Sequence, residues 1–387
     1  MKKWVVPLSD IDFRQEETLA VQQVINSGWL TMGEKTVEFE QDFGKFIDVK
    51  YAFAVANGTV ALHMACLAAG IGPGDEVILP ALTFVATANA VLYCGAKPVF
   101  ADVVSLDDFT ISLESIKKLK SPRTKAIIVM HYGGYPCHME EILLFARENK
   151  LILIEDAAHA PGASLYDIRM GAWGDIGCFS FFANKNMTTG EGGMVTTNDG
   201  EMAEKLKKLR SHGMTSLTWD RHKGHAWSYD VVSLGFNYRI DEIHSALGIE
   251  QLKKLVEFND KRKNIVQDYQ TRFLSGIPEM KIPFLNHPGQ SAYHLMPVLL
   301  PPSIDRIVFM EHMKTAGIQT SFHYPPIYKF SYHKGVINTK DIDLSITEEI
   351  ANREVTLPLY PKLKMEEVQF VVNTIRMIFD ILLKDQD

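Results

Sequence analysis

The hydrophobic residues of the chain follow two alternating patterns, one typical of buried strands and the other of helices. Short runs of consecutive apolar residues predict strands at 51–56, 76–80, 98–102, 126–131 and 151–156. Apolar residues at helical spacing predict helices at 14–27, 37–46, 60–69, 201–210 and 240–249, and a further helix that starts near residue 81. Because apolar runs alternate with helices, we expect an α/β sheet covered by helices on both faces.

The pattern changes after residue 250. A long charged helix is expected at 251–274, and beyond it proline and glycine interrupt the chain. The remaining elements would be strands at 293–301 and 320–323 and helices at 309–316 and 366–383. We therefore expect two domains, a large one over residues 1–250 and a smaller C-terminal α/β domain over residues 251–387.

Composition narrows the class of protein. Hydrophobic residues make up 46% of the 387 residues and charged residues 22%, an ordinary globular balance. The net charge of −7 argues against a broad nucleic-acid-binding surface. No apolar stretch approaches the roughly 20 residues of a membrane span, and the apolar run after Lys3 stops at Pro7. We expect a soluble, cytoplasmic protein that binds neither nucleic acid nor membrane.

Cysteine and histidine give little sign of a metal site. The four cysteines are widely spaced without a Cys-x-x-Cys pair, which disfavours a zinc site or a disulfide framework and fits a reducing compartment. Histidines and basic residues gather at 221–225, but their spacing matches no compact ligand set. This loop is either solvated or in contact with a diphosphate. We expect no metal ligands.

One lysine stands out for its surroundings. Lys185 follows the apolar run 176–182 and precedes a loop with Gly190, Gly192 and Gly193. Desolvation would lower the pKa of this lysine and favour the neutral amine, the form that attacks a carbonyl. The glycines suit a tight loop whose backbone approaches a ligand closely. The alternative is a surface lysine on a glycine-rich turn.

Two further segments carry residues suited to an anion and to acid–base chemistry. The strand at 51–56 passes through Gly58 and Thr59 directly into a helix, which makes either an anion site at the helix N-terminus or a plain threonine cap. Asp156 ends another strand, and ligands of α/β sheets gather at such carboxyl ends. A carboxylate there can also simply cap the following turn.

The segment around Lys185 resembles a known family. Residues 179–193, Phe-Ser-Phe-Phe-Ala-Asn-Lys-Asn-Met-Thr-Thr-Gly-Glu-Gly-Gly, are similar to the cofactor-lysine segment of the DegT/DnrJ/EryC1/StrS aminotransferases, and the likeness runs from about Val6 to Leu363. It implies a fold-type I, aspartate-aminotransferase-like structure with a large, mainly parallel sheet domain. It also implies pyridoxal 5'-phosphate as cofactor and a homodimer with shared active sites.

The resemblance implies a role for each matching residue. Lys185 would attach the cofactor covalently and then act as general base, and Asp156 would keep the ring nitrogen protonated. The phosphate ligands would be Gly58, Thr59, Ser180 and the partner subunit's Asn237. Phe84 would stack on the ring, and His159 would lie near its phenolic oxygen. The weaker substrate candidates are Trp29, Thr31, His323 and Tyr324.

The family implies the reaction as well. An amino donor, glutamate by resemblance, would give its amino group to the ketone of a nucleotide-linked deoxysugar. The alternatives are a cyclitol or other cyclic ketone as acceptor, a pyridoxal-dependent sugar dehydratase, or a non-catalytic regulator that only binds the cofactor. Relatives that are dehydratases replace the lysine with histidine, so Lys185 argues against the lyase. The nucleotide, the sugar, the carbon aminated and the role of Arg239 stay open.

Overall fold

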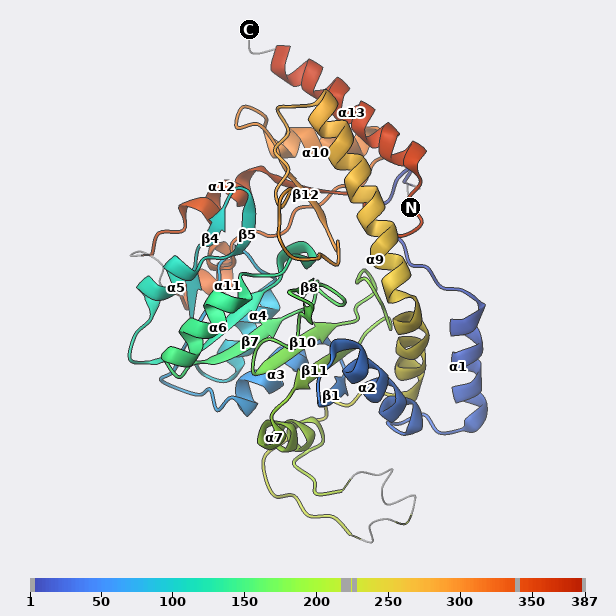
Figure 1. Cartoon of the computed structure of the whole chain (residues 1–387), viewed down its shortest axis with the longest axis vertical. Coiled ribbons are helices and arrows are strands. Elements are labelled where there is room, and N and C mark those ends of the chain that lie inside the picture. The colour runs from blue at the N-terminus through green and yellow to red at the C-terminus, as the bar shows by residue number, and fades with distance from the viewer. Residues whose placement is uncertain (1–3, 217–223, 225–227, 338–341, 385–387) are drawn as a thin grey trace.

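The apolar runs form strands of one seven-stranded sheet at the centre of the larger part of the molecule (Figure 1). The computed structural model describes residues 4–216, 224, 228–337 and 342–384. Across the sheet, the strands are β1 (Tyr51–Val55), β11 (Gly193–Thr197), β10 (Ile176–Ser180), β7 (Ile152–Asp156), β6 (Thr124–Met130), β2 (Glu76–Pro80) and β3 (Lys97–Ala101). β11 is antiparallel to both of its neighbours, and the other pairs are parallel. The expected large, mainly parallel sheet is confirmed.

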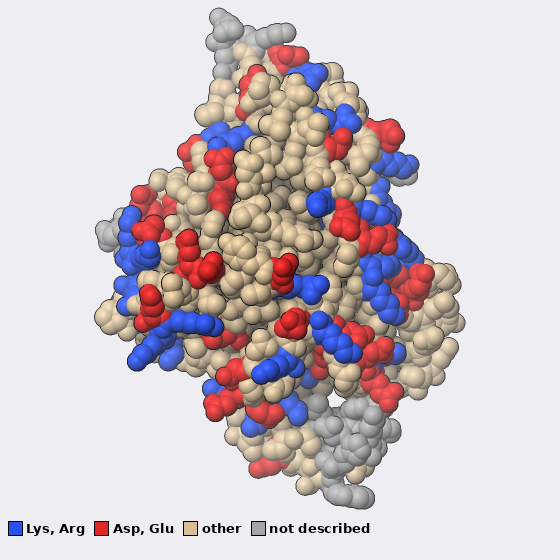
Figure 2. Space-filling view, in the orientation of Figure 1, with Lys and Arg blue, Asp and Glu red and all other residues tan. Residues whose placement is uncertain are grey.

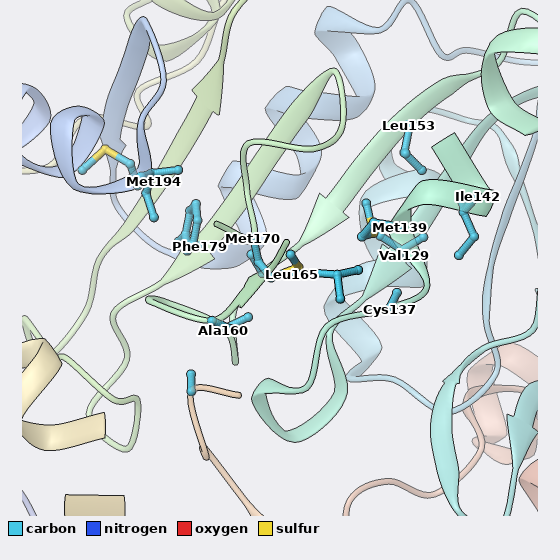
Figure 3. Packing of buried hydrophobic residues seen from close by; sticks show 14 of the residues in the cluster. Val129, Cys137, Met139, Ile142, Leu153, Ala160, Leu165, Met170, Phe179 and Met194 are labelled. Atoms are coloured by element: carbon cyan, nitrogen blue, oxygen red, sulfur yellow. The ribbon is translucent and has the colours of Figure 1, made fainter. Parts of the chain in front are cut away.

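Successive strand residues point to opposite faces of the sheet, so each face has its own core. One core contains Val129, Leu153 and Phe179 of the strands, together with residues of α2, α5 and α6. Figure 3 shows Phe179 and Met194 on neighbouring strands of this core. The other core contains residues of α3, α4 and α7. These helices are α2 (Glu34–Ile47), α3 (Gly58–Ala68), α4 (Val85–Tyr93), α5 (Leu113–Leu119), α6 (Met139–Glu148) and α7 (Gly200–Arg210).

A second part of the molecule is built around a third core. The long helix α9 (Glu242–Gly276) begins beside the sheet, where α1 (Gln15–Ser27) and α2 pack on it, and ends beside α13 (Met365–Lys384) (Figure 1). The third core holds its Phe273 and residues of α10 (Arg306–Thr315), α13 and the antiparallel pair β12 (Met296–Leu299) and β13 (Glu354–Leu357). The remaining short elements are β4 (Val103–Ser105), β5 (Asp108–Ile111), η1 (Tyr132–Gly134), β8 (Ser164–Leu165), β9 (Ile168–Arg169), η2 (Ile327–Lys329), α11 (Ser331–Lys334) and α12 (Ser345–Arg353).

The division at residue 250 falls inside α9. The two helices expected at 240–249 and 251–274 are one continuous helix, and Val6, from the start of the chain, packs in the third core. The third core nevertheless consists mainly of residues beyond 260. The division into domains 1–250 and 251–387 therefore stays a prediction.

Two local expectations are wrong. The strand expected at 320–323 is a single bridge between Ser321 and Thr356, because Pro325 and Pro326 follow and cannot donate to a ladder. The helix expected from residue 81 begins at Val85, and Phe84 is its extended N-cap residue. This shift matters for the site, since it places Phe84 on a turn, where 52% of it is exposed.

The surface carries both signs of charge. Figure 2 shows acidic and basic side chains interspersed over one face of the molecule. In the part of the chain that the structure describes, no helix has both the length and the apolar composition needed to cross a membrane.

Candidate active site

A cavity of about 440 Å³ opens at the carboxyl ends of three adjacent parallel strands. Met130, Asp156 and Ser180 are the last residues of β6, β7 and β10, and all three line it. The N-terminus of α3 forms another wall. Of the residues predicted from the sequence, the cavity brings together Gly58, Thr59, Phe84, Asp156, His159, Ser180, Lys185, His323 and Tyr324.

Lys185 lies on the loop between β10 and β11. Its backbone N–H donates to the carbonyl of Phe182 at 2.9 Å, and Thr188 Oγ1 donates to the carbonyl of Phe181 at 3.1 Å, so the loop is tied to its own stem. Burial of the ammonium lowers the pKa of Lys185 to about 8, although the negative charge of Asp156 opposes this shift. Near neutral pH, part of the Lys185 side-chain population is therefore the neutral amine that can react with a carbonyl.

Glycines in and after this loop allow backbone conformations and close contacts that other residues would not. Gly190 has φ of +83°, a conformation that favours glycine. A Cβ on Gly193 would lie 2.6 Å from the carbonyl oxygen of Asn57, so Gly193 lets β11 pass close to the start of α3. Lys185, Gly58 and Thr59 all line the same cavity.

Asp156 is a buried carboxyl, 3% exposed, on the floor of the cavity. It accepts hydrogen bonds from Thr87 Oγ1 at 2.7 Å and from the N–H of Ala158 at 3.2 Å. Burial raises the pKa of Asp156, while Thr87 and the charge of Lys185 act in the opposite direction. A cation brought against this carboxyl would therefore be stabilised as its counter-ion.

The start of α3 is shaped to hold an anion. Asn57 caps the helix by accepting from the N–H of Val60 at 3.0 Å. In the described part of the chain, the N–H groups of Gly58 and Thr59 have no hydrogen-bond partner. A Cβ on Gly58 would lie 2.8 Å from Ser180 Cβ, so glycine is needed for the hydroxyl of Ser180 to lie beside the helix N-terminus. These groups form a cradle for a phosphate.

Aromatic and imidazole rings form a further part of the cavity lining. The ring centroids of Phe84 and Tyr324 are 5.8 Å apart, and Tyr324 Oη lies 2.9 Å from His159 Nε2. His159 Nδ1 is buried and has no partner among the described residues. Burial lowers the pKa of His159 well below its usual value, with a further contribution from Lys185, so the ring is neutral.

Three predicted residues lie outside this cavity. Trp29 and Thr31 belong to the turn before α2, and Asn237 is exposed in the segment before α9. Arg239 also lies outside it, and its Nη1 is buried without a partner among the described residues. The segment 221–225, apart from Gly224, lies outside the described residues. Within the described residues, no three acidic, histidine or cysteine side chains gather as a metal site would require.

Several residues in or beside the cavity were not predicted from the sequence. Asn184 and Glu191 line the cavity and flank residues that were predicted. His294 is 5% exposed, and its ring centroid lies 4.2 Å from that of His159. Its Nδ1 lies 2.8 Å from Oδ1 of Asn186, the residue after Lys185. The polar pair Asn184 and Asn186 around the lysine was the available signal, whereas His294 is a lone histidine in an apolar run.

Comparisons with known proteins agree with this site. The model of the DegT/DnrJ/EryC1/StrS aminotransferase family matches residues 12–376. The chain is 39% identical over 372 residues to the spore coat polysaccharide biosynthesis protein SpsC of Bacillus subtilis, and covers 94% of both chains. Helicobacter pylori PseC, an aminotransferase involved in the biosynthesis of pseudoaminic acid, has a similar structure with a TM-score of 0.90 and 32% identity, over 98% of this chain and 100% of PseC. The PLP-form of the putative sugar aminotransferase Spr1654 from Streptococcus pneumoniae has a TM-score of 0.90 and 26% identity, over 97% and 99% of the two chains.

The residues of the cavity fit pyridoxal phosphate. The cradle at α3 suits a phosphate, the buried carboxyl suits a protonated ring nitrogen, and the orphaned Nδ1 of His159 is a polar atom that a ligand can satisfy. Lys185 supplies an amine of lowered pKa in the same cavity. This chain is a pyridoxal-phosphate-dependent aminotransferase and belongs to the DegT/DnrJ/EryC1/StrS aminotransferase family.

Proposed function

We propose that the enzyme transfers an amino group from glutamate to the ketone of a nucleotide-linked deoxysugar. The observation that carries this proposal is the gathering of Lys185, Asp156 and the α3 cradle in one cavity. The sugar is supported by the similarity to Spr1654, a putative sugar aminotransferase, and to SpsC, a spore coat polysaccharide biosynthesis protein. A cyclitol or other cyclic ketone is the alternative acceptor.

Each residue would contribute one physical effect. Pyridoxal phosphate supplies an aldehyde that binds amines covalently and a ring that accepts electron density. Gly58, Thr59 and Ser180 would hold its phosphate, and Phe84 would lie against its ring. The carboxylate of Asp156 would hold a proton on the ring nitrogen. The neutral His159 would occupy the position beside the phenolic oxygen without adding a charge.

Lys185 would move the proton that the reaction requires. Its Nζ, neutral in part at pH 7 because its pKa is lowered to about 8, would take the proton from the α-carbon of the amino donor. The same atom would return a proton in the second half-reaction. His323 and Tyr324, which also line the cavity, would contact the substrates. A lysine placed beside Asp156 in the cavity also argues against a regulator that only binds the cofactor.

The function is tested with the purified holoenzyme. Glutamate should change the absorption spectrum of the bound cofactor and release 2-oxoglutarate, and a panel of keto-sugar nucleotides should restore the spectrum and yield an amino sugar. The Lys185→Ala variant should keep its fold, lose covalent cofactor and lose at least about 10²-fold in turnover. Amination of a cyclitol ketone but of no keto-sugar nucleotide in the panel would refute the proposed acceptor.

We also propose that the active form is a homodimer with shared sites. Asn237 is exposed and lies outside the cavity of its own chain. The segment before it exposes a group of apolar side chains, namely Val231 (56%), Val232 (51%) and Leu234 (83%). Apolar residues gathered on a surface in this way are typical of a face that a second protein covers. A second copy would bring the partner subunit's Asn237 to the phosphate.

Mixing two inactive variants tests this sharing. Lys185→Ala and Asn237→Ala each damage every site of their own homodimer. A mixed dimer keeps one site intact, with Lys185 from one chain and Asn237 from the other. Unfolding and refolding an equal mixture should therefore restore about a quarter of the wild-type activity, because half of the dimers are mixed and each has one complete site. Activity no higher than the mean of the two variants would contradict shared sites.

A further inference from the structure

A second buried carboxyl lies behind the cavity, and the mechanism above does not use it. Glu354 is the first residue of β13 and is 1% exposed. Its Oε2 accepts the backbone N–H of His323 at 2.7 Å. Its Oε1 lies 2.6 Å from Thr356 Oγ1, which in turn lies 2.6 Å from His323 Nδ1. A continuous chain of hydrogen bonds thus joins Glu354, through Thr356, to an imidazole that lines the cavity.

The number of protons on Glu354, Thr356 and His323 determines which group donates in each of these hydrogen bonds. A threonine hydroxyl donates one hydrogen, so Thr356 can donate to Glu354 or to His323 but not to both. If Glu354 is ionised, Thr356 donates to the carboxylate, and His323 must donate from Nδ1. If Glu354 carries a proton on Oε1, that proton goes to Thr356, whose hydroxyl then donates to Nδ1. A neutral His323 carries one N–H, so its Nε2 is an acceptor in the first state and a donor in the second.

The surroundings favour neutral groups in this chain. Burial raises the pKa of Glu354 to about 8, although the hydrogen bonds from Thr356 and from the N–H of His323, and then the guanidinium of Arg306 on α10, oppose this shift. Burial, with a further contribution from Lys185, lowers the pKa of His323 to about 4, so the ring is neutral at and above neutral pH. The titratable and charged groups that face Glu354 or His323 from the elements around them are Arg306, Tyr132, Tyr324, Lys185, His159 and His294.

We propose that Glu354 is a positioning residue that sets, through Thr356, which nitrogen of His323 carries the proton in the cavity. Protonated Glu354 makes Nε2–H a donor for an oxygen of the substrate, either a carbonyl or a carboxylate. Ionised Glu354 turns Nε2 into an acceptor, which would repel such an oxygen. The consequence for substrate binding rests on the proposed function, because it requires His323 to contact a substrate oxygen. The tautomer itself does not.

The test is the tautomer of His323 in the holoenzyme as a function of pH. In protein labelled with ¹⁵N-histidine, the shifts of the two ring nitrogens distinguish N–H from bare nitrogen, and a His323→Gln sample assigns the signal. In the wild type, the proton should move from Nε2 to Nδ1 as the pH rises through about 8. In Glu354→Gln, the amide donates to Thr356 at every pH, so His323 should keep Nε2–H from pH 6 to 10.

Two control variants separate this relay from a purely structural role. Thr356→Ser keeps the hydroxyl and should retain the pH-dependent exchange, whereas Thr356→Val has a similar shape without the hydroxyl and should lose it. The pH profile of activity does not decide the question alone, because Lys185 titrates in the same range. With a keto-sugar substrate, however, Glu354→Gln should remove the part of the alkaline rise in KM that depends on His323.

The outcomes are distinct. An identical tautomer change in wild type and Glu354→Gln, or no change in wild type, would overturn the inference whatever the substrate is. If Glu354→Gln does not fold, the Thr356→Ser and Thr356→Val pair gives the same decision. If the tautomer exchange is present but the enzyme aminates no keto sugar, the relay stands and the proposed function fails.

Discussion

Two buried carboxyl groups serve the cavity in different ways, one from its lining and the other from behind it. Asp156 lines the cavity and receives hydrogen bonds from Thr87 Oγ1 and from one backbone N–H. Glu354 does not line it and reaches it only through Thr356 and His323. Burial raises the pKa of both groups, but Lys185 is the cation facing Asp156 while Arg306 faces Glu354 from outside the cavity. Although both groups are buried, Asp156 is placed to face a cationic ligand, whereas Glu354 is placed to control the tautomer of the neutral His323 ring.

The largest effect should come from removing the charge of Asp156, the carboxyl at the end of strand β7. Asp156→Asn removes the carboxylate that would keep the ring nitrogen protonated, so we expect kcat/KM to fall by about 10²–10⁴-fold. Steady-state kinetics with a saturating amino donor measure this. Thr87→Val is the matched control, since it keeps the carboxyl and removes one of its hydrogen bonds, together with the contact between Thr87 Oγ1 and Thr83 Oγ1. It should cost only about tenfold, the lower value expected for a hydrogen bond to a charged group. Equal losses in both variants would contradict the distinct role of Asp156.

The smallest effect concerns stability on the Glu354 side. The folded protein holds a proton on Glu354 up to a pH of about 8, whereas the unfolded chain releases it near the ordinary value of 4.5. The native state therefore binds more protons in this window, and its stability falls as the pH rises, by at most about 1.4 kcal/mol per pH unit. Glu354→Gln has no such proton to lose.

Thermal unfolding from pH 5 to pH 9 checks this sign. The Tm of Glu354→Gln minus the Tm of wild type should grow as the pH rises, because only the wild type is weakened. Asp156 also has a raised pKa, but it is present in both proteins and cancels in the difference. A difference that stays constant across the range would show that Glu354 ionises at its ordinary pKa.

The sequence predicted those parts of the molecule that depend on local pattern. Continuous apolar runs predicted the strands of the sheet, and the end of one of them pointed to Asp156, whereas Ser180 was expected from the family resemblance. Both line one cavity with Lys185. Phe84 was predicted in a helix, but it caps that helix from an extended turn, and this exposes its ring. Helical propensity does not reveal such a boundary to within a few residues.

What the sequence could not predict depends on contacts between distant segments. Glu354 and Thr356 matter because β13 lies beside residue 321 through a single bridge, and no local pattern encodes that contact. The position of His294 beside His159 likewise involves a contact with Asn186, 108 positions earlier in the chain. Trp29, Thr31 and Asn237 lie outside the cavity, and their roles stay predictions.

The uninterrupted helix α9 has a consequence for how this protein can change over evolution. One end of this 35-residue helix packs in the core that contains Phe179, on one face of the sheet, and the other end packs in the third core. Inserting or deleting a single residue midway would turn one end against the other by about 100° and slide it by about 1.5 Å. Such a change would misalign every contact beyond it, so length variation should be tolerated in the loops and excluded from the middle of this helix.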